Sequence, residues 1–303
     1  MAGRFATTAP PDRTIAMAAD SHPATPSTAQ THLVDRLSHL PWWLMIILLG
    51  GVILFYNIST DELYTVIFGR LIQGVGVSLF VAIASYTAAI VIGLIVALGR
   101  VSKNPIAYNL ATLYVNVIRG VPILVQIFYV AFVIGPALIG VLNGLGNGLA
   151  GVLGAENFLA TVTTQDISML ARVMIALAIA YGGFEAETFR AGIESIGRGQ
   201  MEAARSLGMS YFQAMRHIIL PQAFRRVLPP LGNDFISMVK DSSLVSVLGV
   251  RDITQEARLY AAASFRYPET YNTLAFLYLG ITFTLSMGVK FLENRMSRGG
   301  KGS

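Results

Sequence analysis

Six apolar stretches run along the chain, and polar segments separate them. They cover about residues 42 to 58, 72 to 99, 107 to 136, 169 to 192, 228 to 250 and 270 to 291. Each is close to the roughly 20 residues that a helix needs to cross a bilayer. Hydrophobic residues make up 54% of the chain and charged residues only 13%, against about 25% charged in soluble domains. The pattern predicts an all-α integral membrane protein with about six transmembrane helices.

A polar segment from Glu202 to Pro221 stands between the fourth and fifth apolar stretches. Its first half, up to Leu207, is rich in strong helix formers. Gly208 follows, and glycine readily adopts the left-handed conformation that ends many helices. The segment therefore predicts a short helix that begins near Gly199, ends at a turn and lies outside the membrane.

A second helix is expected to follow this turn directly. Ser210 and, three residues later, Gln213 form a capping box, and Pro221 marks the point where the helix should stop. The predicted apolar face contains Phe212, Met215 and Ile218 or Ile219. On residue pattern alone, the pair could also be an amphipathic segment on the inner membrane surface with Glu202 merely solvated.

Basic residues are concentrated in a few segments, and their positions predict which side of the membrane each segment faces. Most of the 22 lysines and arginines fall in the N-terminal tail, residues 100 to 109, residues 190 to 226 and the C-terminus. By the positive-inside rule these segments face the cytoplasm. We therefore expect a multi-pass protein of the bacterial inner (plasma) membrane with both termini in the cytoplasm. Residues 1 to 40, rich in Ala, Thr, Pro and Ser, are predicted to be a disordered cytoplasmic tail.

The segment from 137 to 168 contains no lysine or arginine and many glycines, which suits an external loop. Gly140, Gly144 and Gly148 have the spacing of a close-packing helix face. A flexible glycine-rich connection explains the same residues equally well.

The polar segment also carries the most specific pattern in the chain. Its residues fit, at every position, the pattern E-A-A, three residues, G, nine residues, I-x-L-P: Glu202, Ala203, Ala204, Gly208, Ile218, Leu220 and Pro221. In this the chain resembles the permease subunits of bacterial ABC importers. Other segments are similar to the permeases for polar amino acids: Arg119-Gly120-Val121-Pro122 with Gln126, Ala186-Glu187 with Phe189-Arg190, and Lys240-Asp241-Ser242-Ser243-Leu244. The resemblance covers about residues 70 to 292.

This resemblance implies a fold and a division of the chain. The fold would be the five-helix core of a type I ABC importer plus one extra N-terminal span. The expected parts are the tail (1–40), the extra helix and its connection (41–65), the importer transmembrane domain (66–292) and a cytoplasmic C-terminal tail (293–303). Residues 194–221 would be coupling helices, which in this family dock into a cleft of the ATPase subunit, and the seven residues of the pattern would carry that coupling.

The resemblance also implies partners. They are two ABC ATPase subunits, a second permease subunit that is identical or paralogous, an external substrate-binding protein, the amino acid substrate and membrane lipid, with no nucleic acid. Nothing in the chain resembles the G-x-x-x-x-G-K-[ST] phosphate loop. The chain is therefore not expected to be an enzyme, and ATP and Mg would be bound by the partner ATPase. With no cysteine in the chain and no histidine in an apolar stretch, neither a catalytic residue nor a metal site is expected.

Charged and amide residues inside the apolar stretches are costly in hydrocarbon and normally face a polar pathway or a partner. The candidates for a substrate pathway are Asn116, Arg119, Gln126, Glu187, Lys240 and Asp241. A zwitterionic amino acid needs both a cation and a carboxylate, and this set offers both. For Arg119, Lys240 and Asp241, structural pairing explains the residues equally well. A structural role is favoured for Glu187, which lies three residues from Arg190, and for Gln126, which could bridge helices. Asn116 departs from the acidic residue that relatives often carry, which argues against a cationic substrate.

The expected function is thus ATP-driven import by alternating access, in which the coupling helices transmit ATPase motion. The alternative is an ion-gradient-driven amino acid carrier that acts without an ATPase and uses Asp234, Lys240 and Asp241 for ion coupling. That alternative leaves the polar helix pair without a role.

Overall fold

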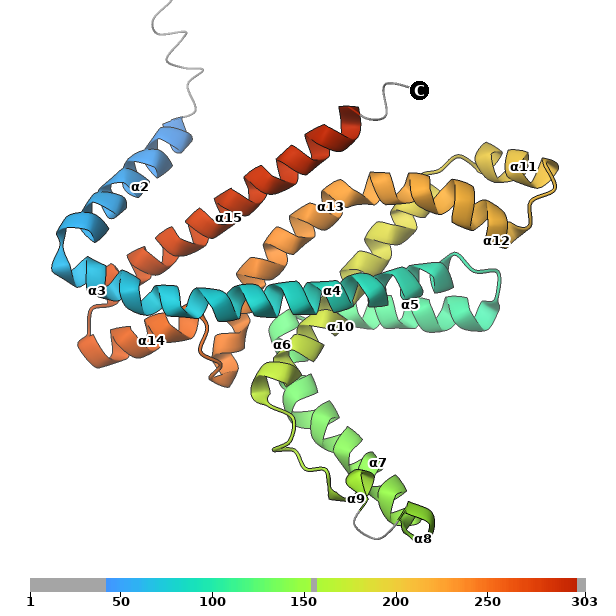
Figure 1. The fold of residues 1–303 in the computed structure, drawn as a ribbon, viewed down its shortest axis with the longest axis horizontal. Helices are drawn as coiled ribbons and strands as arrows, with labels where there is room; N and C mark the ends of the chain where they lie inside the picture. The colour runs from blue at the N-terminus through green and yellow to red at the C-terminus, as the bar shows by residue number, and fades with distance from the viewer. Residues whose placement is uncertain (1–41, 154–156, 299–303) are drawn as a thin grey trace, which may run out of the picture. The chain divides into compact units, whose positions relative to one another are not determined.

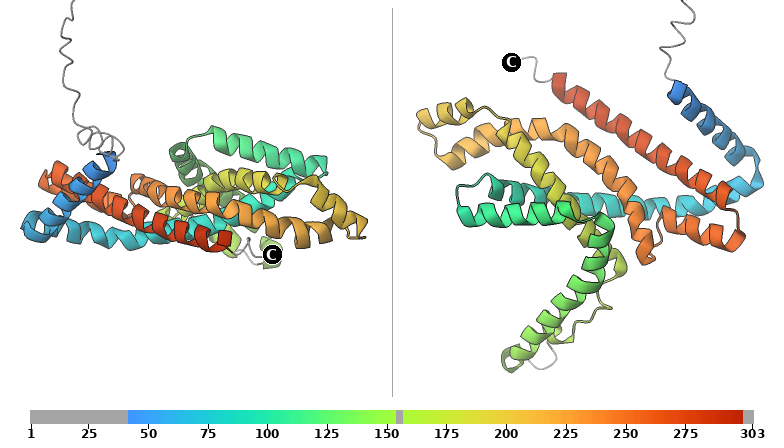
Figure 2. Two further views of the ribbon diagram at one scale, coloured as in Figure 1. Left: turned by 90° about the horizontal axis from the view of Figure 1, so that it is seen from above. Right: turned by 180° about the vertical axis from the view of Figure 1, so that it is seen from behind.

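The computed structural model describes residues 42–153 and 157–298 (Figures 1 and 2). Contacts divide the chain into two units, residues 1–50 and 51–303. The described residues of the first unit are helical. The predicted tail of residues 1–40 and the last residues of the C-terminal tail lie outside the described part.

All regular elements in the described residues are helices. In chain order they are α2 (Trp42–Thr60), α3 (Glu62–Leu71), η1 (Ile72–Gly74), α4 (Val75–Arg100), α5 (Pro105–Gly120), α6 (Ile123–Tyr129), η2 (Val130–Ile134), α7 (Gly135–Gly148), α8 (Ala150–Leu153), α9 (Phe158–Thr161), α10 (Met169–Glu194), α11 (Arg198–Ser206), α12 (Tyr211–Ala214), η3 (Met215–Ile219), α13 (Leu220–Asp241), η4 (Ser242–Leu248), α14 (Ile253–Ser264) and α15 (Tyr267–Arg298). The short elements η2 and η3 are π-helical, whereas η1 and η4 are 3-10 helices.

Four helical stretches of the described chain are long and apolar enough to cross a membrane. They are Glu62–Arg100, Ile123–Gly148, Met169–Glu194 and Tyr267–Arg295, and Met45–Thr60 is a shorter apolar helix. The predicted span at 228–250 corresponds to α13 and η4, which are helical but richer in charge. The all-α membrane fold is confirmed, although length and hydropathy alone identify four of the six predicted spans.

The helix α10 is the centre of the second unit. It packs along α4 and also contacts α5 and α13. Glycine makes these approaches possible: a Cβ added at Gly93 of α4 would lie 2.5 Å from the Cβ of Glu185, and one at Gly183 would lie 2.7 Å from a methyl group of Ile118. Small residues let membrane helices approach closely in this way, and van der Waals packing then holds them.

The third apolar stretch is broken at Pro122, a residue type whose ring interrupts helical hydrogen bonding. The helix α5 ends at Gly120, Val121 is extended, and α6 begins after Pro122. The buried Gln126 bridges the gap, since its Nε2 donates to the carbonyl oxygens of Ile118 and Val121, both at 2.7 Å. Its amide thus satisfies the carbonyl of Ile118, which Pro122 leaves without a helical donor, and the carbonyl of the extended Val121.

The predicted external loop is helical over its first part, which corrects the loop assignment. The helix continues through η2 and α7 as far as Gly148, and α9 packs beside it (Figure 1). The predicted glycine face is not packed within the described chain, because a Cβ at Gly140, Gly144 or Gly148 would meet no atom within 4 Å. The close contact instead involves Gly146, which lies against the backbone of Ala160. Close helix packing in this segment therefore depends on Gly146 alone among these four glycines.

The sequence analysis did not single out Arg172, in the first turn of α10, yet its side chain is buried. The guanidinium donates to the carbonyl oxygens of Ala131 in η2 (3.0 Å) and Ile167 (3.1 Å), and it also bonds that of Thr164. A single cation therefore fastens the segment before α10 to the π-helical turn.

Replacing Arg172 with leucine is expected to destabilise the protein, because one buried and two partly buried hydrogen bonds to carbonyl groups lose their charged donor. Hydrogen bonds to charged groups contribute about 1.5–3 kcal/mol each, so a loss of roughly 3 kcal/mol or more is expected. Thermal unfolding in detergent would measure it, with Arg251→Leu at an exposed position as the control. Equal melting temperatures for the two variants would contradict this role.

The helix does not stop at Pro221, which corrects the prediction for the second polar helix. Backbone dihedrals remain helical through Leu220, and α12, η3 and α13 form one continuous helix. The π-helical turn η3 makes this possible, because proline is tolerated where the preceding turn is already opened and no N–H donor is needed. The side-chain amide of Gln222 then donates to the carbonyl of Ile218 (2.9 Å).

At the N-terminal end of α4, the N-terminus of α14 lies against η1. Gly74 has no room for a Cβ there, since one would lie 2.4 Å from the backbone carbon of Asp252. Asp252 is fully buried and caps α14, with Oδ1 accepting from the N–H of Gln255 at 2.8 Å. Burial raises the pKa of Asp252 to about 6.

This burial predicts a pH-dependent stability. Because the folded pKa of Asp252 lies above the unfolded value of about 3.9, the folded state holds the proton more tightly, and its advantage is lost as pH rises from about 4 to 6. Asp252→Asn keeps the capping oxygen and removes the titration. The melting temperature of the variant relative to wild type is expected to rise between pH 4.5 and 7.5, by an amount equivalent to at most about 3 kcal/mol. A constant difference across this range would contradict the prediction.

Candidate functional site

The helix pair α11–α12 has the turn geometry that its sequence predicts. Gly208 has a φ of 83°, and the N–H groups of Gly208 and Met209 donate to the carbonyls of Arg205 and Ala204, as in a Schellman C-cap. Ser210 and Gln213 then form the reciprocal capping box. The turn between the helices is therefore fixed by backbone bonds on both sides.

The matched pattern residues divide into an outward and an inward set. Glu202 and Ala203 are exposed, whereas Ala204 is buried. Ile218 and Leu220 are half-buried and Pro221 is exposed. The exposed apolar surface at the turn is continued by Leu207, 84% exposed, and Phe212, 69% exposed. The sequence pattern groups Phe212 with Met215 and Ile219 on one apolar face, but in the structure only Met215 and Ile219 are buried.

The buried side of the helix pair is attached to α10. Met215, Ile219 and Ala223 pack against Ile193 and Ile196 at the end of α10. A further bond runs from the guanidinium of Arg226 in α13 to the carbonyl of Ser195 (2.6 Å). Together with the helical continuity into α13, these contacts join the pair to both helices that it connects.

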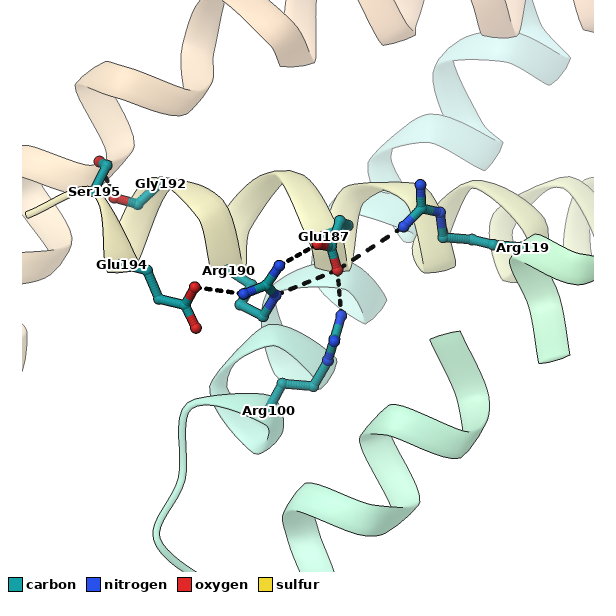
Figure 3. Close-up of polar contacts among 7 residues, drawn as sticks. All are labelled: Arg100, Arg119, Glu187, Arg190, Gly192, Glu194 and Ser195. Atoms are coloured by element: carbon teal, nitrogen blue, oxygen red, sulfur yellow. Dashed lines mark hydrogen bonds and ion pairs between the residues drawn. The ribbon is translucent and has the colours of Figure 1, made fainter. Parts of the chain in front are cut away.

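Nearby, charged residues from three helices converge on Glu187 (Figure 3). Its carboxylate pairs with Arg100 at the end of α4 and with Arg190 one turn along α10, and Nε of Arg190 lies 3.3 Å from it. Arg190 also pairs with Glu194. The predicted pairing of Glu187 with Arg190 is therefore present, and Arg100 is a partner that the sequence analysis did not identify.

Arg119 is the most loosely held cation of this cluster. Its guanidinium nitrogen lies 3.9 Å from the carboxylate of Glu187, and its side chain is 44% exposed. The guanidinium also lies 5.7 Å from the ring centroid of Phe184, within cation–π range. Asn116, three residues earlier on α5, is exposed as well. The three arginines drawn around Glu187 and Glu194 leave one positive charge in excess, and Arg119 is the group free to meet an anion.

The fifth predicted span contributes a separate polar group. Asp241 accepts a hydrogen bond from the hydroxyl of Tyr181 in α10 (2.7 Å), and the ring of Tyr181 meets Tyr86 of α4 edge-on at 6.4 Å. Lys240 is exposed and makes no ion pair within the described residues. The six pathway candidates thus do not gather in one pocket of the described chain: Arg119 and Glu187 lie together, Gln126 spans the helix break, and Asp241 lies near Tyr181.

Glu185 is a further buried acidic group, and it is not among the pathway candidates. It is fully buried at the contact between α10 and α4, and neither carboxylate oxygen has a geometrically acceptable hydrogen bond in the described chain. From the sequence, Glu185 could have been identified only as an acidic residue within an apolar stretch. Among the described residues no group of three His, Asp or Glu side chains converges to hold a metal ion.

Comparison with known proteins adds the following. The family described as binding-protein-dependent transport system inner membrane component matches residues 89–298. The probable amino-acid permease protein YxeN of Bacillus subtilis (strain 168) is 36% identical over 231 residues, which are 76% of this chain and 93% of that protein. The glutamine transport system permease protein GlnP of Escherichia coli (strain K12) is 34% identical over 226 residues, 75% of this chain and 92% of its own.

A solved structure agrees with these matches. The crystal structure of an amino acid ABC transporter with histidines superposes with a TM-score of 0.62 at 34% identity, and it covers 78% of this chain and 99% of the matched chain.

Proposed function

The chain belongs to the family of binding-protein-dependent transport system inner membrane components, and on that premise we propose that it is the permease subunit of an ABC importer for a polar amino acid. The names of its relatives supply the substrate class. In this proposal ATP and Mg are bound by a partner ATPase, and this subunit forms the path across the membrane.

The observation that carries the proposal is the mechanical attachment of α11–α12. The pair presents Glu202, Ala203 and the turn at Gly208 outward, while its other face is packed on α10 and its end is continuous with α13. A force applied to the exposed turn therefore acts on two membrane helices at once. ATPase closure would move the pair and switch the pathway between inward and outward access.

The substrate would be recognised through both of its charges. Arg119, loosely held by Glu187 and Phe184, is assigned the substrate carboxylate. Asp241, whose partner among the described residues is the hydroxyl of Tyr181, is assigned the ammonium group. In this scheme Glu187 and Gln126 hold the helices in place, while Asn116 and Lys240 line the path.

The remaining partners follow from the class of transporter. The proposed assembly contains a second permease, identical or paralogous, two ATPase subunits in the cytoplasm and an external substrate-binding protein. Both termini and the helix pair would then face the cytoplasm, in agreement with the basic segments around them. The family match favours this assembly over a carrier driven by an ion gradient, which would not use the helix pair.

Purification of the full chain from its native membrane in mild detergent tests the proposal. We expect a nucleotide-binding subunit to co-elute and its ATPase activity to rise with a polar amino acid and the binding protein. A chain that is stable in the detergent yet transports without any ATPase, and whose uptake an ionophore abolishes, would overturn the proposal and support the carrier.

A charge reversal at Glu202 tests the coupling surface. Glu202 is exposed and makes no ion pair within the described chain, so Glu202→Lys leaves folding intact. It is expected to weaken ATPase attachment or uncouple hydrolysis from uptake, because it places a cation where a basic partner group would meet the carboxylate. Uptake and substrate-stimulated ATPase activity should fall about tenfold or more, a change of roughly 1.4 kcal/mol.

The matched control is Glu62→Lys, the same change at an exposed position in α3, far along the chain from the helix pair. Normal uptake in the Glu202 variant, or an equal loss in the control, would remove Glu202 from the coupling surface.

A further inference from the structure

A groove of about 670 Å³ lies beside the helix pair, between the end of α4 with its following loop and the segment α12–η3. Its floor is apolar and consists of Leu98 of α4, Val101 directly after α4, Met215 from η3 and Leu220 at the start of α13. The groove thus lies at the C-terminal end of α4, which belongs to a helical stretch long and apolar enough to cross a membrane.

The rim of the groove is basic. Lys103, Arg205 and Arg216 line it, all three are exposed, and none of them makes an ion pair within the described residues. No acidic side chain lines the groove in the part of the chain that the structure describes. Three unpaired cations over an apolar floor complement a molecule that has both an anionic head and an apolar tail.

Two aromatic side chains complete the lining. Tyr211 and Phe212 of α12 border the groove and are exposed. Aromatic residues are enriched where proteins meet the interface between headgroups and acyl chains. Of the seven residues assigned to coupling only Leu220 lines the groove, whereas the outward-facing Glu202, Ala203 and Gly208 do not. The groove therefore adjoins the surface assigned to the ATPase without including its exposed residues.

We propose that this groove binds an anionic phospholipid, with its phosphate on Lys103 and Arg216 and an acyl chain along Leu98, Val101 and Leu220. The assignment of the groove to the cytoplasmic leaflet rests on the proposed function, in which the helix pair faces the cytoplasm. Basic pockets between membrane helices on this side are suited to anionic headgroups. The lipid would fill the space between α4 and the helix pair and so restrain the element that is assigned to coupling.

Native mass spectrometry of the delipidated full chain, titrated with phosphatidylglycerol or phosphatidylcholine, tests this inference. Wild type is expected to retain phosphatidylglycerol more tightly. The double variant Lys103→Gln with Arg216→Gln is expected to lose affinity on the order of thirtyfold, since each cation near an anionic lipid contributes roughly fivefold. Arg205 is left unchanged because it adjoins the coupling residues.

The matched control removes two exposed cations near the end of α15, Lys290→Gln with Arg295→Gln, and should bind phosphatidylglycerol as wild type does. A second variant, Val101→Trp, fills the floor and should weaken binding with all charges kept.

Three results would overturn the inference: equal affinity for the two lipids, equal loss in both double variants, or displacement by inorganic phosphate alone, which would indicate a soluble anion. Release of the lipid by added ATPase subunits would instead assign the groove to protein contact. None of these readouts depends on transport, so their failure is distinguishable from failure of the proposed function.

Discussion

Substrate uptake is expected to fall to near background when Gly208 is replaced by proline, while insertion into the membrane is unchanged. The φ of 83° at this residue lies in the left-handed region, whereas proline holds φ near −65°. The substitution also removes the N–H that donates to the carbonyl of Arg205 at 3.0 Å. The turn must then re-form with α11 displaced from α12.

The expected fall in activity follows from the backbone strain that proline would introduce at this φ. Backbone strain of this kind costs about 1–3 kcal/mol, and each 1.4 kcal/mol is about a factor of ten, so substrate-stimulated ATPase activity should fall roughly tenfold to a hundredfold. Gly199→Ala is the control, because this glycine has helical geometry and an added Cβ would meet nothing within 4 Å. Normal coupling in Gly208→Pro would show that the turn does not transmit force.

Replacing Glu187 with glutamine is expected to destabilise the whole helix assembly. The carboxylate is the shared partner of Arg100, Arg119 and Arg190, and its removal leaves three cations facing one another. Breaking a buried pair costs about 3–5 kcal/mol, and the cost here lies at or below that range because 28% of the side chain is exposed. A fall of roughly 6–10 °C in melting temperature is expected.

The control for this prediction lies two turns along the same helix. Glu194→Gln removes a carboxylate that pairs only with Arg190 and is 53% exposed. An exposed pair of this kind contributes about 0–1 kcal/mol, so the melting temperature should change little. Similar shifts in the two variants would show that Glu187 is not the centre of the cluster.

Features that depend on neighbouring residues could be predicted from the sequence. The capping box at Ser210 and Gln213, the left-handed Gly208 and the break at Pro122 all follow from local backbone chemistry, and all three are present. The apolar stretches gave the membrane class for the same reason, since each helix must satisfy its own backbone groups in lipid.

Features that depend on distant residues could not be predicted in this way. Pro221 ends no helix because Met215 and Ile219 pack on α10 and stabilise a π-helical turn before it. The role of Arg172 could not be predicted because its acceptors are main-chain carbonyl groups, one of them 41 residues away. Such acceptors produce no pattern of side chains in the sequence. Arg100 joins Glu187 across 87 residues. The sequence therefore identified the charged residues of the candidate pathway. It could not identify their partners, because these depend on which helices pack together.

The π-helical turn η3 also fixes the rotation of α12 about the helix axis relative to α13. It places one more residue in the continuous helix from α12 to α13 than a regular α-helical turn would hold. Deleting one residue there would rotate α12 by about 100° about the helix axis relative to α13. The direction in which the exposed turn faces can thus be reset by a change in length within Met215–Ile219, with every residue of the coupling surface and of the membrane helix retained.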